Sequence, residues 1–369
     1  MINTKEFYDY LVAKDLNFFV GVPDSLLKNI CACIKENSDS KHNIIAANEG
    51  NAVAIASGYH MASGKFGIVY MQNSGLGNTV NPLLSLADEE VYNIPMLLII
   101  GWRGEPGKKD EPQHVKQGKL TLPLLETMGI EYMILDNNYQ EQIDKCYNYM
   151  KETNKPIALV VKKDTFDSYS ITKDKNDYTL TREEALDTVL KELGDEDFIV
   201  STTGKTSREI FELREKNHQG HANDFLTVGS MGHTASIAFG MCLSTDKNVY
   251  CIDGDGSFIM HMGGFAVIAQ NPCTNFKYIL INNGAHESVG GQPTVGFNIK
   301  IDEILKAVGF KNVYIAKEKE DIIKALSNMK TNSMEALVIY TKQGSREDLG
   351  RPTTTPVENK LALMDKISK

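Results

Sequence analysis

Short apolar runs alternate with helix-like stretches along most of the chain. In the first half, the runs that read as buried strands are Ile44–Ala47, Gly67–Tyr70, Met96–Ile100, Tyr132–Leu135 and Ile157–Val161. Amphipathic stretches such as Ala52–Ala62 and Gln140–Met150 lie between them. In the second half, the strand candidates are Phe198–Ser201, Phe225–Val228, Val249–Ile252, Tyr278–Ile281 and Leu337–Tyr340. Strands buried on both faces that alternate with helices predict parallel sheets with crossover helices.

The pattern is interrupted once, near the middle of the chain. Residues 165–180 are polar, have no hydrophobic period and are typical of a linker. The pattern resumes at Thr181-Arg-Glu-Glu184, which has the form of a helix N-cap with acidic residues in the first turn. We therefore expect two α/β domains, residues 1–164 and 181–369, joined by the linker 165–180 and without a sequence repeat of short period.

Composition narrows the class of protein. The 369 residues are 42% hydrophobic and 24% charged, which fits a folded globular protein, and the net charge of −9 argues against a general nucleic-acid binder. The six cysteines are scattered, without a CxxC pair, and are expected to be buried in a reducing compartment. No signal-peptide core and no apolar run of about 20 residues is evident, so we expect a cytoplasmic protein with no membrane partner.

The most specific local signal consists of two segments that follow predicted strands. Ile252-Asp-Gly-Asp-Gly-Ser257 is the first, and Ile279-Leu-Ile-Asn-Asn-Gly-Ala285 is the second. Ligands bind at the carboxyl ends of strands in open α/β sheets, and glycines let the backbone approach a phosphate closely. Asp255 and Asn283 offer hard oxygen ligands that, with a backbone carbonyl and diphosphate oxygens, would suit Mg²⁺.

This pair of segments resembles the metal–diphosphate motif of thiamine-diphosphate enzymes. The resemblance implies a Mg²⁺ site formed by Asp255, Asn283 and the carbonyl of Ala285. The segment 44–58 is similar to the part of these enzymes that carries the activating glutamate. It implies that Glu49 binds the pyrimidine ring and activates the cofactor. The family fold has a pyrimidine-binding and a diphosphate-binding domain, and its cofactor lies between two subunits, so at least a homodimer is implied.

Further segments extend the resemblance. Gly229-Ser-Met-Gly-His233 is similar to the family segment in which an apolar residue, here Met231, lies under the cofactor. Ser201-Thr-Thr-Gly-Lys-Thr-Ser207 is not a P-loop, because the Walker pattern needs a glycine where Ile199 stands. The candidate cofactor-binding residues are Glu49, Asn78, Thr203, Gly204, Lys205, Gly229, Met231, Gly254, Asp255, Gly256, Ser257 and Asn283.

The substrate expected from the resemblance is a small anionic 2-keto acid. The chain has room for the two cofactor domains but not for the middle domain of longer decarboxylases. In this it resembles the phosphonopyruvate and sulfopyruvate decarboxylases, and as a fused chain it looks most like the former. This implies decarboxylation of 3-phosphonopyruvate to phosphonoacetaldehyde in phosphonate biosynthesis. Candidate substrate residues are Asp24, Ser25, Gln72, Asn73, Arg103, Lys108, His286, Arg346 and Arg351, and the candidate catalytic residues beside Glu49 are His114 and His286.

Other functions stay open at this point. Sulfopyruvate is a tetrahedral anion like phosphonopyruvate, so residue types separate the two substrates poorly. The absence of a middle domain argues against a carboligating synthase. The presence of Glu49, Asp255 and Asn283 argues against a cofactor-binding protein without catalytic activity. A nicotinamide dehydrogenase lacks support because Gly75-Leu-Gly-Asn-Thr-Val80 is not a GxGxxG fingerprint.

Overall fold

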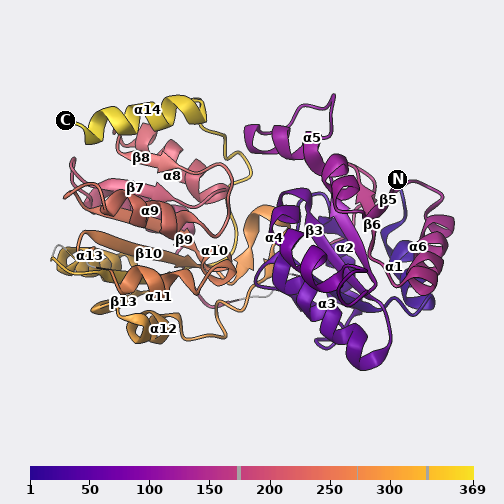
Figure 1. Ribbon diagram of the computed structural model, residues 1–369. Coiled ribbons are helices and arrows are strands. Elements are labelled where there is room, and N and C mark those ends of the chain that lie inside the picture. The colour runs from indigo at the N-terminus through magenta and orange to yellow at the C-terminus, as the bar shows by residue number, and fades with distance from the viewer. Residues whose placement is uncertain (173–175, 272, 330–331) are drawn as a thin grey trace. The chain divides into compact units, whose positions relative to one another are not determined.

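The computed structural model describes residues 1–172, 176–271, 273–329 and 332–369 (Figure 1). The chain divides into two compact units. Unit 1 comprises residues 1–173 and 289–292, and unit 2 comprises residues 174–288 and 293–369. Residues 173–175 of the expected linker lie outside the described residues. Its residues 166–172 pack on unit 1, where Asp167 accepts hydrogen bonds from the backbone and hydroxyl of Thr4 at 2.8 and 2.7 Å.

Each unit contains one six-stranded sheet in which all strand pairs are parallel. Unit 1 has the order β2-β1-β3-β4-β6-β5, formed by β1 (Phe18–Gly21), β2 (Asn43–Ile45), β3 (Gly67–Gln72), β4 (Met96–Gly101), β5 (Glu131–Ile134) and β6 (Ile157–Val161). Unit 2 has the order β13-β14-β10-β9-β7-β8, formed by β7 (Phe198–Ser201), β8 (Asp224–Leu226), β9 (Val249–Gly254), β10 (Phe276–Asn282), β13 (Asn312–Ala316) and β14 (Glu335–Tyr340).

The two sheets have the same topology. When the strands are numbered from the start of each unit, both orders read 2-1-3-4-6-5. The chain therefore repeats its architecture although its sequence shows no repeat. In such sheets the connections leave the first and third strands in opposite directions, and ligands bind at the carboxyl ends of the strands near that point.

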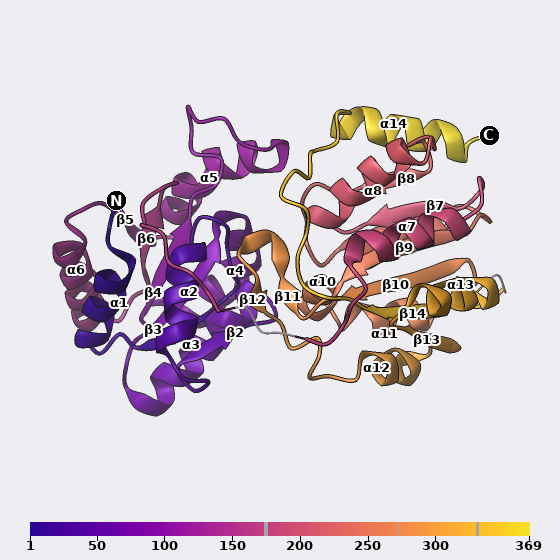
Figure 2. The ribbon, with the colours of Figure 1, turned by 180° about the vertical axis from the view of Figure 1, so that it is seen from behind.

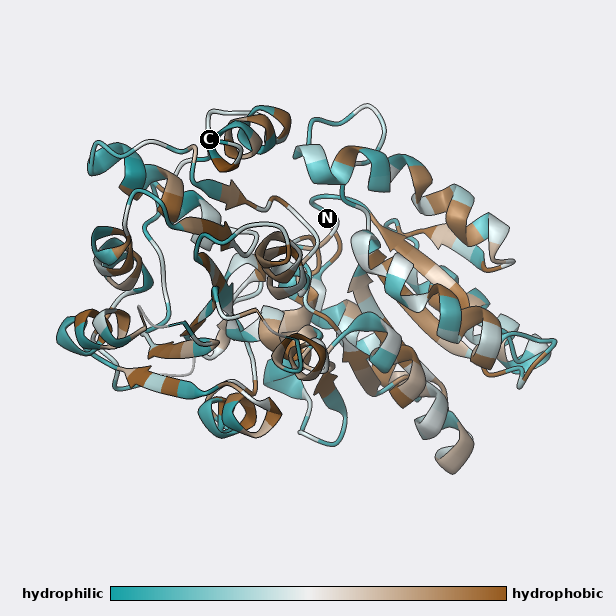
Figure 3. Cartoon of the chain, turned by 60° about the vertical axis from the view of Figure 1, so that its left-hand side comes forward, coloured by the Kyte–Doolittle hydropathy of each residue, from teal (hydrophilic) through white to brown (hydrophobic). Residues whose placement is uncertain are grey.

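Helices cover both faces of the unit 1 sheet. One layer is α1 (Thr4–Ala13), α2 (Lys28–Asn37) and α6 (Tyr139–Thr153). The other layer is α3 (Glu49–Ser63), η1 (Asn73–Gly75), α4 (Leu76–Pro82), η2 (Leu83–Ala87) and α5 (Pro112–Thr127). Each layer buries its own apolar cluster against the sheet, and the strands are accordingly the most uniformly hydrophobic elements in Figure 3.

Unit 2 is layered in the same way. One face of its sheet carries α7 (Arg182–Glu192), α8 (Lys205–Lys216) and α13 (Lys319–Asn328). The other carries α9 (Thr234–Cys242), α10 (Asp255–Met260), α11 (Gly264–Ala269) and α12 (Ile301–Val308). The C-terminal helix α14 (Pro356–Ile367) packs beside the edge strand β8 (Figure 2). A small hairpin of β11 (Ala285–His286) and β12 (Gln292–Pro293), with the turn η3 (Glu287–Val289), follows β10, and its residues 289–292 are counted with unit 1.

The α/β fold predicted from the hydrophobic pattern is confirmed, and the described residues show no third sheet domain. Two strands of the six-stranded sheets escaped the prediction, as did the short hairpin strands β11 and β12. β1 is a buried run of four residues that the prediction overlooked, and β13 is an edge strand whose side chains are partly exposed. The predicted strand 249–252 continues to Gly254, so Asp255 opens helix α10 directly. Among the described residues, none of the helices has the length and hydrophobicity needed to span a membrane.

Candidate active site

Glu49 lies at the carboxyl edge of the unit 1 sheet, as the first residue of α3. The preceding Asn48 caps the helix, since its side chain accepts a hydrogen bond from the backbone of Asn51 at 2.9 Å. The Glu49 carboxylate is 5% exposed and accepts a hydrogen bond from Asn78 Nδ2 at 2.7 Å. A side chain at Gly75 would overlap this carboxylate, so glycine is required there. The structure thus brings Glu49 and Asn78 together in a tightly enclosed position.

A second group of predicted residues surrounds Asp24, in the loop after β1. Asp24 is fully buried, and burial raises the pKa of its carboxyl. It accepts hydrogen bonds from Gln72 Nε2 at 2.5 Å and from the backbone of Leu26 at 3.0 Å. Ser25 lies beside it and accepts a hydrogen bond from Arg103 Nη1 at 2.8 Å. Loops after three neighbouring strands, β1, β3 and β4, therefore meet here.

Arg103 is held by a residue that sequence reasoning missed. Its guanidinium forms a bidentate ion pair with Asp110, which keeps the pKa of that carboxyl well below its usual range. Asn73 holds the Arg103 backbone from both sides, since it donates to the Arg103 carbonyl at 2.8 Å and accepts from the Arg103 amide at 3.1 Å. The side chain of Asn73 is therefore occupied in supporting the loop. Lys108, farther along the loop, is exposed.

His114 lies in the first turn of α5 and is buried. Its Nδ1 atom has no hydrogen-bond partner among the described residues. Burial, with a smaller contribution from the Arg103 charge, lowers the pKa of His114 to about 4. At neutral pH the imidazole is therefore uncharged and offers a proton acceptor or donor close to the Arg103 loop.

In unit 2 the expected metal ligands lie at the ends of adjacent strands. Asp255 follows β9 and Asn283 follows β10, and the register pairs Gly254 with Ile281. All three expected ligands are buried, with Asp255 2%, Asn283 4% and Ala285 6% exposed. The Asn283 side-chain oxygen accepts a hydrogen bond from the Ala285 amide at 3.1 Å. One carboxylate and one amide oxygen are thus presented side by side.

Residues 294–296 complete the surroundings of Asp255 and carried no signal in the sequence. The Thr294 hydroxyl donates to the Asp255 carboxylate. Gly296 approaches so closely that a side chain there would meet the Asp255 carboxylate at 2.6 Å. The ion pairs of the described residues include none to Asp255, and burial raises its pKa to about 6. A bound cation would therefore stabilise this carboxylate.

Met231, Gly256 and His286 converge beside the metal loop. The backbone turns at Ser230 and Gly232, which have positive φ angles of 58° and 86°, and the Gly232 amide donates to Ser257 Oγ at 3.1 Å. A side chain at Gly256 would meet the His286 ring at 2.8 Å and the Met231 methyl at 3.2 Å. Desolvation lowers the pKa of His286 to about 4. Gly229 and Gly254 flank these residues at the ends of their loop and strand, respectively.

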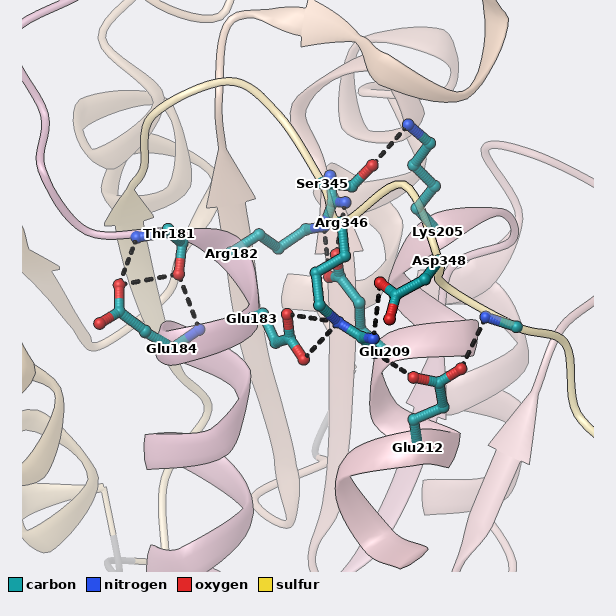
Figure 4. Close-up of polar contacts among 11 residues, drawn as sticks. Thr181, Arg182, Glu183, Glu184, Lys205, Glu209, Glu212, Ser345, Arg346 and Asp348 are labelled. Atoms are coloured by element: carbon teal, nitrogen blue, oxygen red, sulfur yellow. Dashed lines mark hydrogen bonds and ion pairs between the residues drawn. The ribbon is translucent and has the colours of Figure 1, made fainter. Parts of the chain in front are cut away.

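The loop after β7 brings Thr203, Gly204 and Lys205 to the same edge of the sheet. Gly204 has a φ of 92°, and a side chain there would meet Ser288 Oγ at 2.6 Å. Lys205 Nζ donates to Ser345 Oγ at 2.7 Å and lies 3.9 Å from Glu287 Oε1. Arg346, a predicted substrate residue, is surrounded by Glu183, Glu212 and Asp348 (Figure 4), whereas Arg351 is exposed.

Comparison with known proteins agrees with this arrangement. Residues 4–123 match the thiamine pyrophosphate enzyme N-terminal TPP binding domain, and residues 202–340 match the corresponding C-terminal TPP binding domain. The phosphonopyruvate decarboxylase of Streptomyces hygroscopicus is 30% identical over 97% of this chain and 92% of that protein. The protein of the same name from Streptomyces viridochromogenes is 29% identical over 97% and 93%. The sulfopyruvate decarboxylase of Methanosarcina acetivorans is 29% identical over 84% and 83%.

The chain therefore belongs to the thiamine pyrophosphate enzymes. Within that family it is a decarboxylase, a carboxy-lyase, which confirms the class of enzyme expected from the sequence.

The residues present fit the thiamine diphosphate that this family uses. Unit 2 offers a glycine-flanked strand end and the buried Asp255 carboxylate, which forms no direct ion pair with the described residues. The described residues contain no group of three or more histidine, cysteine or acidic side chains that could bind a metal alone. A metal site built on Asp255 thus depends on amide and carbonyl oxygens and on oxygens of the ligand. Unit 1 offers the enclosed carboxylate of Glu49, a side chain suited to a hydrogen bond with a ring nitrogen.

Proposed function

We propose that the enzyme catalyses the thiamine-diphosphate- and Mg²⁺-dependent decarboxylation of 3-phosphonopyruvate to phosphonoacetaldehyde and CO₂, as a step of phosphonate biosynthesis. The carrying observation is that the relatives matched over 97% of this chain are named phosphonopyruvate decarboxylases. The second candidate, 3-sulfopyruvate, is supported by a relative that covers 84% of the chain.

The buried groups of each unit suit the parts of such a reaction. When bound, thiamine diphosphate supplies an electron sink for the electron pair left by departing CO₂. Asp255, Asn283 and the Ala285 carbonyl would hold Mg²⁺ and through it the diphosphate. Glu49, enclosed and hydrogen-bonded by Asn78, would hold a proton against the pyrimidine ring. Uncharged His286, beside Met231 and Gly256, is suited to proton transfer near the metal loop.

The unit 1 cluster suits recognition of an anionic substrate. Arg103 presents Nη1 to Ser25, while Asp110 pairs with its Nε and Nη2 atoms. Buried Asp24, which accepts a hydrogen bond from Gln72, supports the neighbouring Ser25, and neutral His114 supplies a further polar group. Phosphonate carries more negative charge than sulfonate at neutral pH, so a fully charged guanidinium favours the phosphonate.

The direct test is CO₂ release by the purified enzyme with thiamine diphosphate and Mg²⁺. Phosphonopyruvate, sulfopyruvate and pyruvate are compared in parallel by kcat/KM. We expect phosphonopyruvate to be preferred at least tenfold over the other two. A preference for sulfopyruvate would keep the chemistry and refute the substrate. No CO₂ release from any of the three, with cofactor bound, would refute the decarboxylase proposal for these substrates.

Self-association is the second part of the proposal. Helix α3 of unit 1 exposes Ile55 and Met61, and the α9 and α11 region of unit 2 exposes Leu243, Met262 and Val267. Large apolar side chains that are exposed on helices are compatible with an interface between copies. The test assumes that each active site uses unit 1 of one copy and unit 2 of another. Mixing the inactive variants Glu49→Gln and Asp255→Asn should then restore about a quarter of the wild-type activity in a dimer. Half of the randomly assorted dimers are mixed, and each mixed dimer has one intact site of two.

The cysteines bear on the cellular location. All six cysteines are unpaired and buried, which is usual in a reducing compartment, and we propose that the enzyme acts in the cytoplasm.

A further inference from the structure

The segment after β14 is fastened to unit 2 through Arg346. Its Nε donates to both carboxylate oxygens of Glu183 at 3.0 Å, Nη1 donates to Asp348 at 3.0 Å, and Nη2 donates to Glu212 (Figure 4). Glu183 belongs to the first turn of α7 and Glu212 to α8, so one side chain joins two helices to the segment. Three carboxylates around one guanidinium leave little electrostatic reason for it to bind a further anion.

The same segment contacts the active-site edge through residues next to Arg346. The Gly344 amide donates to Glu287 Oε2 at 2.9 Å, and Ser345 Oγ accepts from Lys205 Nζ at 2.7 Å. On the far side of Arg346, the Gly350 amide donates to Glu212 Oε1 at 2.6 Å. Glu212 therefore fixes both the guanidinium and the segment backbone, and residues 344–350 are held at both ends.

Glu287 and Lys205 connect this segment to the metal loop. Glu287 Oε2 also accepts a hydrogen bond from Asn283 Nδ2 at 3.3 Å, and that bond orients the Asn283 oxygen away from Glu287. Lys205 opens α8 directly after Gly204, and its Nζ lies 3.9 Å from Glu287 Oε1. The spacing of Lys205, Glu209 and Glu212 places all three along one face of α8. On that face Glu209 forms a buried bidentate pair with Arg182, which fixes α7 against α8.

We propose that Arg346 is a positioning residue: its ion pairs with Glu183, Glu212 and Asp348 hold residues 344–350 so that Gly344 and Ser345 orient Glu287 and Lys205 beside the metal and diphosphate loop. This inference rests on the proposed function, because it assigns that loop to Mg²⁺ and the diphosphate. It differs from the role expected from the sequence, in which Arg346 contacts the substrate. The two roles predict different kinetic effects.

The test is the variant Arg346→Gln, with Lys191→Gln as the control. Lys191 forms an exposed ion pair with Asp187 on α7, so its replacement removes a cation from the same unit without touching the segment. Cofactor affinity is measured by isothermal titration calorimetry of thiamine diphosphate in saturating Mg²⁺. We expect the Kd of Arg346→Gln to rise about tenfold or more and that of the control to stay within about twofold. Hydrogen–deuterium exchange of peptides covering residues 341–355 should become faster in Arg346→Gln alone.

A second variant keeps the test valid if Arg346→Gln unfolds. Ser345→Ala retains the Arg346 ion pairs and removes only the acceptor for Lys205. It should weaken cofactor binding severalfold while exchange in the segment stays slow. In the double variant the two effects should be less than additive, since both act through Lys205.

The outcomes separate this inference from the function on which it rests. If Arg346→Gln binds the cofactor as the wild type does but raises the substrate KM tenfold, Arg346 contacts the substrate and the positioning role is refuted. If both the cofactor affinity and the exchange of Arg346→Gln match the wild type, the inference alone is refuted. If the wild type itself does not bind thiamine diphosphate with Mg²⁺, both the proposed function and this inference are refuted.

Discussion

Replacing Asp255 by asparagine should stabilise the ligand-free enzyme while removing its response to magnesium and cofactor. The carboxyl is 2% exposed, and burial raises its pKa from 3.8 to about 6. A difference of about 2 pKa units corresponds to about 3 kcal/mol lost when the buried group ionises. Asparagine has the same shape and no charge, but it gives up one acceptor oxygen, which costs about 1 kcal/mol. We therefore expect the free energy of unfolding at pH 7.5 to rise by about 1–3 kcal/mol.

The pH dependence follows from the direction of the shift. Because the folded-state pKa of Asp255 lies above the unfolded value of 3.8, the unfolded chain ionises first as the pH rises. The carboxyl therefore reduces stability progressively between about pH 4 and pH 6, and the full penalty is present above that window. The stability advantage of Asp255→Asn over the wild type should accordingly be largest at neutral pH and disappear as the pH falls, so that below about pH 4 only the cost of about 1 kcal/mol for the lost acceptor remains.

The assay is urea unfolding with and without ligands. At a cofactor concentration 100 times the Kd, with saturating Mg²⁺, the wild type should gain about 2.7 kcal/mol, and Asp255→Asn should gain almost nothing. The exposed variant Asp365→Asn, which loses only a helix-surface pair with Lys369, serves as the matched control and should behave like the wild type. The reasoning is refuted if ligand-free Asp255→Asn is less stable than the wild type, or if both are stabilised equally by the ligands.

Three other predictions follow from separate features. Glu49→Gln should bind the cofactor but lower kcat at least about 100-fold, as measured by CO₂ release, and near-normal turnover would contradict the activating role. Glu209→Gln leaves Arg182 buried without its carboxylate and should destabilise the enzyme by about 3–5 kcal/mol in urea unfolding, whereas Asp187→Asn at an exposed pair should cost less than about 1 kcal/mol. The pKa of His114 is about 4 in the folded state and 6.5 in the unfolded state, so the free energy of unfolding of the wild type should fall by up to about 3 kcal/mol as the pH drops from 6.5 to 4. If a His114→Gln variant loses stability with pH as steeply as the wild type, this prediction is refuted.

The sequence predicted the parts of the fold that follow local rules. Uniformly apolar runs such as Met96–Ile100 marked central strands, and Thr181 with Glu184 marked the start of α7 through a capping box that the structure contains. The partly exposed edge strand β13 lacks such a signal, whereas the four-residue strand β1 is a buried apolar run that the prediction overlooked. Their positions depend on pairing with strands distant in the sequence, which no local pattern encodes.

The candidate site divides in the same way. The positions of Asp255 and Asn283 at the sheet edge could be predicted, because each follows a strand directly along the chain. Thr294, Gly296 and Asp110 could not be identified, because they reach their partners through loops whose course depends on tertiary contacts. The partners of Arg346 could not be predicted either, because Glu183 and Glu212 lie on two different helices far from it in the sequence. Neighbouring carboxylates determine the local role of an arginine, and those neighbours appear only in three dimensions.

The shared 2-1-3-4-6-5 strand order separates what the scaffold specifies from what it leaves variable. Corresponding strand ends carry different chemistry: Glu49 in unit 1 and Met231 in unit 2 follow the second strand, and Gln72 ends the third strand of unit 1 whereas Asp255 follows that of unit 2. Each unit closes its own apolar clusters on both faces of its sheet. Core residues in one unit can therefore diverge without compensating changes in the core of the other. An architecture of this kind lets two copies of one topology specialise independently, with selection for catalysis concentrated on a few loops at one edge of each sheet.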